Sequence, residues 1–174
     1  MRAAAFVFAV TAAFAGSSAQ AQQGAPNDAQ IAHIVVTANQ VDIDAGKLAK
    51  SKSKNSDVKA FGQQMITDHS GVNKQATALV KKLKVKPEDN PTSKSLKEGG
   101  KENIANLKKL KGADFDRAYV DHEVEYHQQV VDAIDKTLLP NAKNAELKDL
   151  ITKVRPAIVA HLEHAKQIQA KLGK

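Results

Sequence analysis

Cysteine and tryptophan are both absent from this sequence, and aromatic residues make up only 4% of it. Without cysteine the chain forms no disulfide, so its folded part must be held together by its apolar core. Cores built from alanine, valine, leucine and isoleucine are typical of helix-on-helix packing and suit a β-sandwich or barrel poorly. The sequence also lacks a Gly-x-Ser-x-Gly elbow and a glycine-rich phosphate loop, which leaves nucleophilic catalysis with little support.

Long apolar runs are missing as well, except near the first residue. Arg2 precedes an apolar stretch from Ala3 to Ala15, and Ala19-Gln20-Ala21 then fits the small-x-small rule for leader cleavage. The stretch is too short and too rich in alanine for a stable membrane anchor, although an uncleaved anchor is the alternative. We therefore expect residues 1–21 to be a signal peptide cleaved near Ala21. The mature protein, residues 22–174, is expected in the periplasm as a single helical domain.

Positive charge is in excess, with a formal net charge of +7. Basic proteins often bind nucleic acid or anionic membranes. Here the lysines are spread through the chain, arginine is rare, and no aromatic residues interleave with the lysines as a stacking platform. We predict no nucleic-acid partner, a mostly solvated lysine surface and at most a weak contact with the anionic envelope surface. The oligomeric state stays open.

Apolar residues recur at helical spacing over four long segments. These segments are expected at about residues 28–54, 57–84, 112–139 and 144–172. The polar connection at about 85–111 contains two prolines and a Gly-Gly pair, and it holds only one weak helical stretch. A connection this long suits a crossover along the length of a bundle. The prediction is an all-α, ferritin-like four-helix bundle with a long crossover between the second and third long helices.

Three residues inside these helices carry local predictions. Gly46 and Gly62 each lie about two turns from the break at Asn55, which puts them at the same height on facing helices. A glycine inside a helix costs about 1 kcal/mol relative to alanine. Close approach of the two backbones would explain both glycines, and chance is the alternative. Pro156 lies inside the last helix and is expected to bend it.

Polar residues on the inner helix faces are the most specific chemical signal. At about 100° per residue, His69, His127 and His161 lie at the centres of their apolar stripes. Glu123 precedes His127 by one turn on the same face. Asp42 lies at the inner edge of the first helix, and His164 lies at the inner edge of the last. Their heights along the helices differ by only a few Å. The predicted metal site consists of Asp42, His69, Glu123, His127, His161 and His164.

Other polar residues are predicted to lie outside this site. His122, Glu125 and Glu163 point outward by the same helical count. His33 lies near the N-terminal end of the first helix and off its apolar stripe.

Two explanations remain for the inward histidines. Burying several polar groups in an alanine–valine core costs free energy unless they are paired. Imidazole together with carboxylate suits zinc, iron or copper, so a metal ion is one explanation. A hydrogen-bonded polar layer that sets the helix register is the other. The di-iron signature Glu-x-x-His is missing, because Ile66, Val124 and Ile158 precede the three central histidines by three residues.

Several of these segments resemble a bacterial family known as domain of unknown function 4142, which is ferritin-like in fold. The matching pieces are Asp42–Ala49, Met65–His69, Gly112–Tyr119, the helix that reaches His127, and Pro156 followed by His161-Leu162. They span about residues 28–170, and the Asp-His and Phe-Asp-x-x-Tyr pieces are the most specific. The family pattern usually has glutamate where this chain has Asp42. The resemblance implies the fold and an exported envelope protein, and it implies no activity.

Three functions follow from these observations. The first is a periplasmic metal-binding or metal-buffering protein, which predicts metal-dependent stability. The second is a non-catalytic envelope or stress protein, whose lysine-rich surface binds a partner or anionic lipid while the histidines are structural. The third is a redox enzyme of the di-iron type, which the missing signature makes the weakest hypothesis, so the chain is expected to be a binding protein more than an enzyme.

Overall fold

The computed structural model describes residues 24–173, and the predicted signal peptide with its cleavage site at Ala21 lies outside the described residues. The described chain is all-helical, without a strand, which confirms the predicted fold class at that level. None of its helices combines the length and apolar character that a membrane span requires. The helices are α1 (Asp28–Lys52), α2 (Ser56–Lys82), α3 (Pro91–Lys109), α4 (Gly112–Ala133), a π-helical turn η1 (Ile134–Leu138), α5 (Leu139–Asn141) and α6 (Ala145–Leu172).

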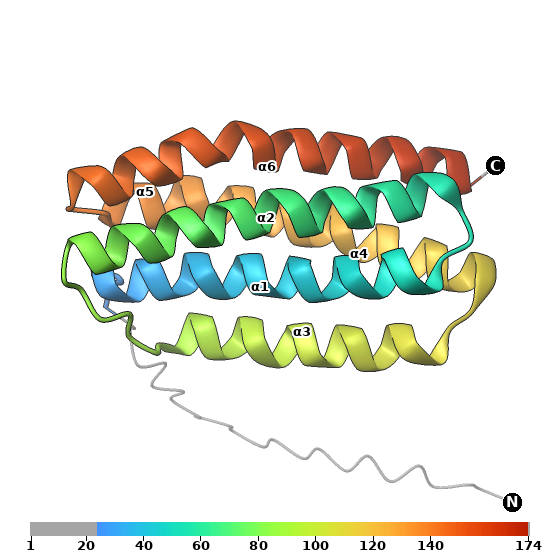
Figure 1. Ribbon diagram of the computed structural model, residues 1–174, viewed down its shortest axis with the longest axis horizontal. Coiled ribbons are helices and arrows are strands. Elements are labelled where there is room, and N and C mark those ends of the chain that lie inside the picture. The colour runs from blue at the N-terminus through green and yellow to red at the C-terminus, as the bar shows by residue number, and fades with distance from the viewer. Residues whose placement is uncertain (1–23, 174) are drawn as a thin grey trace, which may run out of the picture.

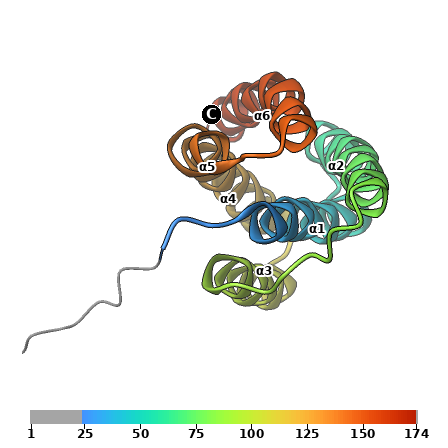
Figure 2. The ribbon, with the colours of Figure 1, turned by 90° about the vertical axis from the view of Figure 1, so that its left-hand side faces the viewer.

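The long helices lie side by side along the longest axis of the molecule (Figure 1). Viewed end-on, α1, α2, α4 and α6 surround a common interior, whereas α3 packs on the outer side of α1 (Figure 2). Because α3 carries the chain back along the whole length of the molecule, α2 and α4 run in the same direction (Figure 1).

Asparagine side chains begin four of the long helices. Asn27, Asn55, Asn90 and Asn144 each accept hydrogen bonds from backbone N–H groups of the following turn. These bonds satisfy donors that a helix start otherwise leaves unpaired. The helix ends therefore fall close to the breaks that the sequence predicts.

The connection between α2 and α4 is more helical than the sequence predicts. One weak helical stretch is expected at 85–111, but α3 runs for 19 residues and continues through Gly99-Gly100. A capping box formed by Asn90 and Ser93 stabilises its first turn. A Cβ on Gly100 would lie 2.8 Å from a methyl carbon of Val41, so the glycine permits close packing of α3 on α1. Tertiary contact thus compensates for weak helix propensity.

The two glycines of α1 and α2 confirm the predicted close approach of these helices. A Cβ on Gly46 would lie 2.7 Å from the carbonyl oxygen of Gly62, and one on Gly62 would lie 2.8 Å from that of Gly46. Any larger residue would force the two backbones apart. Gly46 follows Asp42 by one turn and Gly62 precedes His69 by about two turns, so this contact sets the spacing of the helices beside the central polar residues.

The end of α4 departs from the expected regular helix. The predicted segment 112–139 becomes α4, the π-helical turn η1 and the single turn α5. A π-helical turn widens a helix locally and is rare outside functional or strained positions. Pro156 lies within α6, the helix that follows α5 in the chain, and Figure 1 shows α6 bowed near its middle, as the proline predicts.

The apolar core is divided into two clusters, one toward each end of the helices. The first cluster contains Phe61, Met65, Phe115 and Val120 among its fully buried members. The second cluster contains Ile31, Ile34, Ile134, Leu138, Ile151 and Ile158. On each of α1, α2, α4 and α6, buried polar residues lie between these two sets, and they form the candidate site.

Candidate metal centre

A layer of buried polar side chains separates the two apolar clusters. Each of these side chains is at most 5% exposed. We call them the central layer: Asn39 and Asp42 on α1, His69 on α2, Glu123 and His127 on α4, and His161 on α6. All occupy the middle parts of their helices, so side-by-side packing brings them to one height, as the sequence count predicts.

The three histidines of the central layer form a triangle. The ring centroids are 5.2 Å apart for His69 and His161, 5.5 Å for His127 and His161, and 5.8 Å for His69 and His127. One ring nitrogen of each histidine lies within 4.8 Å of one ring nitrogen of both others. An ion placed between them would therefore meet nitrogen donors from three helices.

A chain of hydrogen bonds sets the tautomer of His69. The backbone carbonyl of Val36 can only accept, so the Asn73 amide donates to it, over 3.4 Å. The Asn73 oxygen then accepts from the Asn39 amide at 3.0 Å, which leaves the Asn39 oxygen to accept from His69 Nδ1 at 2.7 Å. Nδ1 of His69 therefore carries the proton. Nε2 carries a lone pair, and it has no hydrogen-bond partner within residues 24–173.

The other two histidines are oriented in the same way. His127 Nδ1 donates to the backbone carbonyl of Glu123 at 2.9 Å, and His161 Nε2 donates to Asp68 Oδ2 at 2.9 Å. Both acceptors hold a proton on the outer side of the ring. The opposite nitrogens, His127 Nε2 and His161 Nδ1, are buried without a partner in the described part of the chain.

Two carboxylates complete the central layer. Asp42 Oδ2 lies 3.4 Å from His69 Nε2, and Glu123 Oε2 lies 3.5 Å from His127 Nδ1. Asp42, Glu123 and His127 form a second group whose donor atoms lie within 4.8 Å of one another. Both oxygens of Glu123 and the hydroxyl of nearby Tyr119 are buried and lack a hydrogen-bond partner among the described residues.

Burial keeps the histidines of the layer neutral. Desolvation, followed by the two neighbouring imidazoles, lowers the pKa of His69 to about 3. Desolvation likewise lowers the pKa of His127 to about 4 and is the largest influence on His161, whose pKa is lowered in spite of Asp68. A neutral imidazole is the form that ligates a metal ion.

Burial has the opposite effect on the acids. Desolvation raises the pKa of Glu123 to about 8, while contacts with Asp42 and Tyr119 act against this shift. Desolvation and then Glu123 raise the pKa of Asp42 well above its ordinary value. Two carboxyl groups this close in a dry interior do not both ionise without a cation, so the pair retains a proton.

The arrangement matches what a metal ion requires of a protein. The three histidines form one group of donors, and Asp42 and Glu123 form a second group with His127; imidazole and carboxylate are donors that suit zinc, iron or copper. Each imidazole also donates a hydrogen bond from its other ring nitrogen to an acceptor, and such a bond commonly orients a metal-binding histidine. Asn39, the carbonyl of Glu123 and Asp68 fill that role for the three rings.

Five of the six predicted site residues come together, and His164 does not. Its Nδ1 lies 3.1 Å from the Gln64 side-chain oxygen, and its ring packs edge-on against Phe61 with centroids 5.2 Å apart. Among the residues predicted to point outward, His122 is half-buried, because its ring stacks on Tyr126 at 5.7 Å. His33 is also half-buried, and its Nδ1 lies 3.1 Å from the Ser93 hydroxyl.

The sequence did not predict the side chains that accept hydrogen bonds from the histidines and so orient them. Asn39 contacts a residue 30 positions away and Asp68 one 93 positions away, so neither contact follows from helical spacing. Two signals were present. Asn39 is a polar residue within the buried stripe of α1, and Asp68 belongs to the Asp-His pair that carried the family resemblance.

The sequence model of a family described as Domain of unknown function (DUF4142) matches residues 13–168, and the chain belongs to this family. No match was found among curated proteins or among solved structures. The family description states no activity, so the function must be argued from the central layer.

Proposed function

We propose that this member of the DUF4142 family binds a divalent transition metal ion in its central layer. The ligands are His69 Nε2, His127 Nε2 and His161 Nδ1, together with Glu123, Asp42 or both. Zinc, iron and copper are the expected ions. The observation that carries the proposal is that each of the three rings has one nitrogen bound to an acceptor and the other buried without a partner among residues 24–173, while one nitrogen of each ring lies within 4.8 Å of one nitrogen of both others.

A purely structural polar layer is the competing explanation. Such a layer stabilises a fold when its members bond to one another, and an unpaired buried polar atom is expensive. Here three imidazole nitrogens and both oxygens of Glu123 are unpartnered within residues 24–173. Each of the three rings makes one hydrogen bond, through the nitrogen opposite the unpartnered one, which favours a bound cation over a self-sufficient network.

Binding is better supported than catalysis. Asp42, Glu123 and the three histidines are each at most 3% exposed, which leaves little room for a substrate beside the ion. The Glu-x-x-His pairs of di-iron enzymes are missing from the sequence. Storage, buffering or structural use of a metal fits these two facts.

The wider setting of the site is part of the proposal. A ferritin-like four-helix bundle of α1, α2, α4 and α6 with α3 as the crossover is supported by the common direction of α2 and α4. We place the protein in the periplasm on the strength of the leader pattern in residues 1–21. The scattered lysines support no nucleic-acid partner.

The direct test is the metal content of protein purified without a polyhistidine tag, measured by elemental mass spectrometry. We expect about one equivalent of one transition metal per chain, since the two groups of donors share His127, whose neutral ring offers one lone pair. His127→Gln should lose it. His164→Gln is the matched control and should retain it, because His164 lies outside the layer. Metal-free wild-type protein whose melting temperature does not rise with zinc, iron or copper would exclude the proposal.

A further inference from the structure

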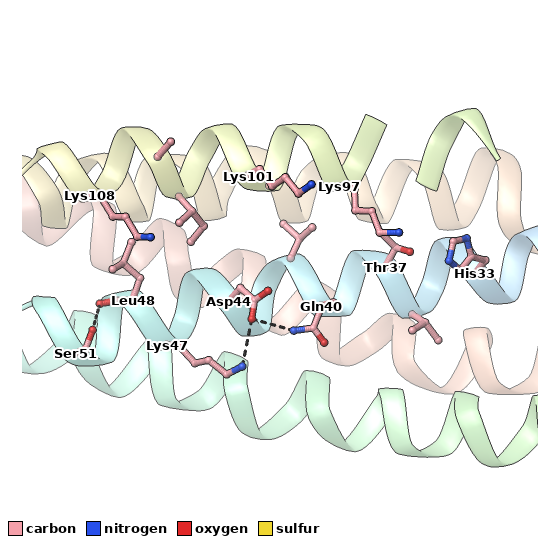
Figure 3. Close-up of a pocket in the computed structure, with 15 residues that line it drawn as sticks. His33, Thr37, Gln40, Asp44, Lys47, Leu48, Ser51, Lys97, Lys101 and Lys108 are labelled. Atoms are coloured by element: carbon pink, nitrogen blue, oxygen red, sulfur yellow. Dashed lines mark hydrogen bonds and ion pairs between the residues drawn. The ribbon is translucent and has the colours of Figure 1, made fainter. Parts of the chain in front are cut away.

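A long groove lies on the surface between α1 and α3. Its volume is about 1120 Å³ (Figure 3). None of its lining residues belongs to the central layer. The groove is therefore a separate candidate site from the proposed metal centre.

The floor of the groove is apolar. Val36, Val41 and Leu48 of α1 and Ile104 of α3 line it, and all four are partly exposed to solvent. Their side chains carry no hydrogen-bonding group. The close contact of Gly100 with Val41 holds the two helices together at this point, so the floor is a firm surface and not a gap that α3 can close.

The rim of the groove is basic. Lys97, Lys101 and Lys108 extend from one side of α3 toward α1 (Figure 3). Lys101 and Lys108 have no ion-pair partner within residues 24–173. Lys97 forms a long ion pair, with its Nζ 4.0 Å from Asp89 Oδ1. The lining contains one acid, Asp44, which Lys47 already pairs at 3.2 Å. The rim therefore keeps an uncompensated positive charge.

We propose that this groove binds a single-chain anionic amphiphile, of which a long-chain fatty acid is the simplest example. The alkyl chain would cover the apolar floor, and the carboxylate would lie among the lysines of α3. The lining runs from His33 to Ser51 on α1, which is about 27 Å of helix and long enough for an extended hexadecanoate chain. An apolar floor under a basic rim matches both parts of such a ligand.

The experiment is displacement of a fluorescent anthroyloxy-stearate probe from the purified protein by hexadecanoate. We expect saturable binding that weakens about tenfold in the double variant Lys101→Glu/Lys108→Glu, because two exposed attractive contacts become repulsive. The matched control is Lys59→Glu/Lys148→Glu, which makes the same change in net charge at exposed positions of α2 and α6. It should leave the affinity within about twofold. Circular dichroism verifies that both variants fold.

The ligand series separates the two halves of the proposal. Octanoate should bind at least about tenfold more weakly than hexadecanoate, because it leaves much of the floor uncovered. Failure of hexadecanoate to displace the probe would overturn the proposal. Equal affinity in the groove variant and its control would also overturn it, since the ligand would then lie elsewhere. Binding to phosphatidylglycerol vesicles without binding of monomeric hexadecanoate would identify a membrane-surface contact instead.

Discussion

The central layer and the two apolar clusters beside it are built on the same helices and are equally buried, but they differ in what they require. Phe115 and Met65 are 0% exposed and need only neighbours of the right shape. Glu123 and His127 are also 0% exposed, yet they contain polar atoms without partners in the described chain. Burial stabilises the clusters in any buffer. In the layer, burial without partners costs free energy, and the proposed metal ion would offset this cost.

The largest effect on the free energy of unfolding is expected from a substitution in an apolar cluster. Phe115→Ala should lower the free energy of unfolding by about 3–5 kcal/mol, because it empties a fully buried site. The loss should be equal with chelator and with metal, since Phe115 lies about two turns from Glu123 along α4. Urea unfolding under both conditions measures it. A loss that appears only in the metal-loaded protein would show that the cluster and the layer are not independent.

Acidification should act on the layer and spare the clusters. His69 and His127 have folded pKa values of about 3 and 4, below the ordinary value of 6.5. The unfolded chain therefore takes up protons first, and stability present above pH 6.5 is lost as the pH falls toward 4. We expect about 1 kcal/mol per pH unit for each histidine in the metal-free protein. His127→Leu should reduce this acid-side slope, and an unchanged slope would contradict the assignment.

Glu123 should produce the opposite dependence. Its folded pKa of about 8 is above the ordinary 4.5, so its contribution is fully present below pH 4.5 and is lost progressively as the pH rises from 4.5 to about 8. Glu123→Gln cannot ionise, so in chelator this loss should disappear and the histidine slope between pH 4.5 and 6.5 should become steeper. Urea unfolding between pH 4.5 and 9 provides the comparison, and a loss that persists in the variant would assign it to another group.

A smaller change in the free energy of unfolding, opposite in sign to that of Phe115→Ala, is expected when a histidine of the layer is replaced by an apolar residue. His127→Leu removes a buried nitrogen without a partner and keeps the side-chain volume similar. In chelator the free energy of unfolding should stay equal or rise by about 1–2 kcal/mol. The rise in melting temperature on adding metal should disappear. If instead the metal-free variant is less stable than wild type by more than about 2 kcal/mol, the histidine is structural.

The smallest effect is expected at the edge of the layer. Asp68 is half-exposed and orients His161 from outside, so Asp68→Ala should weaken metal binding about tenfold without changing its stoichiometry. Competition with a chelator measures the affinity. Because the contact is partly solvated, the stability of the metal-free protein should change by less than about 0.5 kcal/mol. Loss of all bound metal would make Asp68 a ligand.

Features of the fold and the site that follow from periodicity within one helix were predictable from the sequence. Apolar spacing located the long helices, and the same count placed His69, His127 and His161 inside. His164 does not join the cluster, because a side chain at the edge of an apolar stripe can point toward the interior or away from it. Here a contact with the Gln64 side chain and packing against Phe61 hold its ring outside the central layer.

What the sequence could not predict depends on contacts between helices. The helix α3 persists through two glycines because α1 packs against it, and the π-helical turn has no local signal. The proton positions on the three rings follow from Asn39, Asp68 and a backbone carbonyl, of which two lie on other helices. These bonds are what favours the proposed ligand set over a structural polar layer, and they become visible only after the helices are packed.

The most direct test of the central claim is the X-ray absorption spectrum of the metal-loaded protein, recorded beside that of His127→Leu. For zinc we expect nitrogen and oxygen ligands at about 2.0–2.2 Å, with the outer-shell scattering of three imidazoles. The variant should bind no metal or show one imidazole fewer. A wild-type spectrum without imidazole scattering, or one that His127→Leu leaves unchanged, would place the ion outside the central layer and contradict the account.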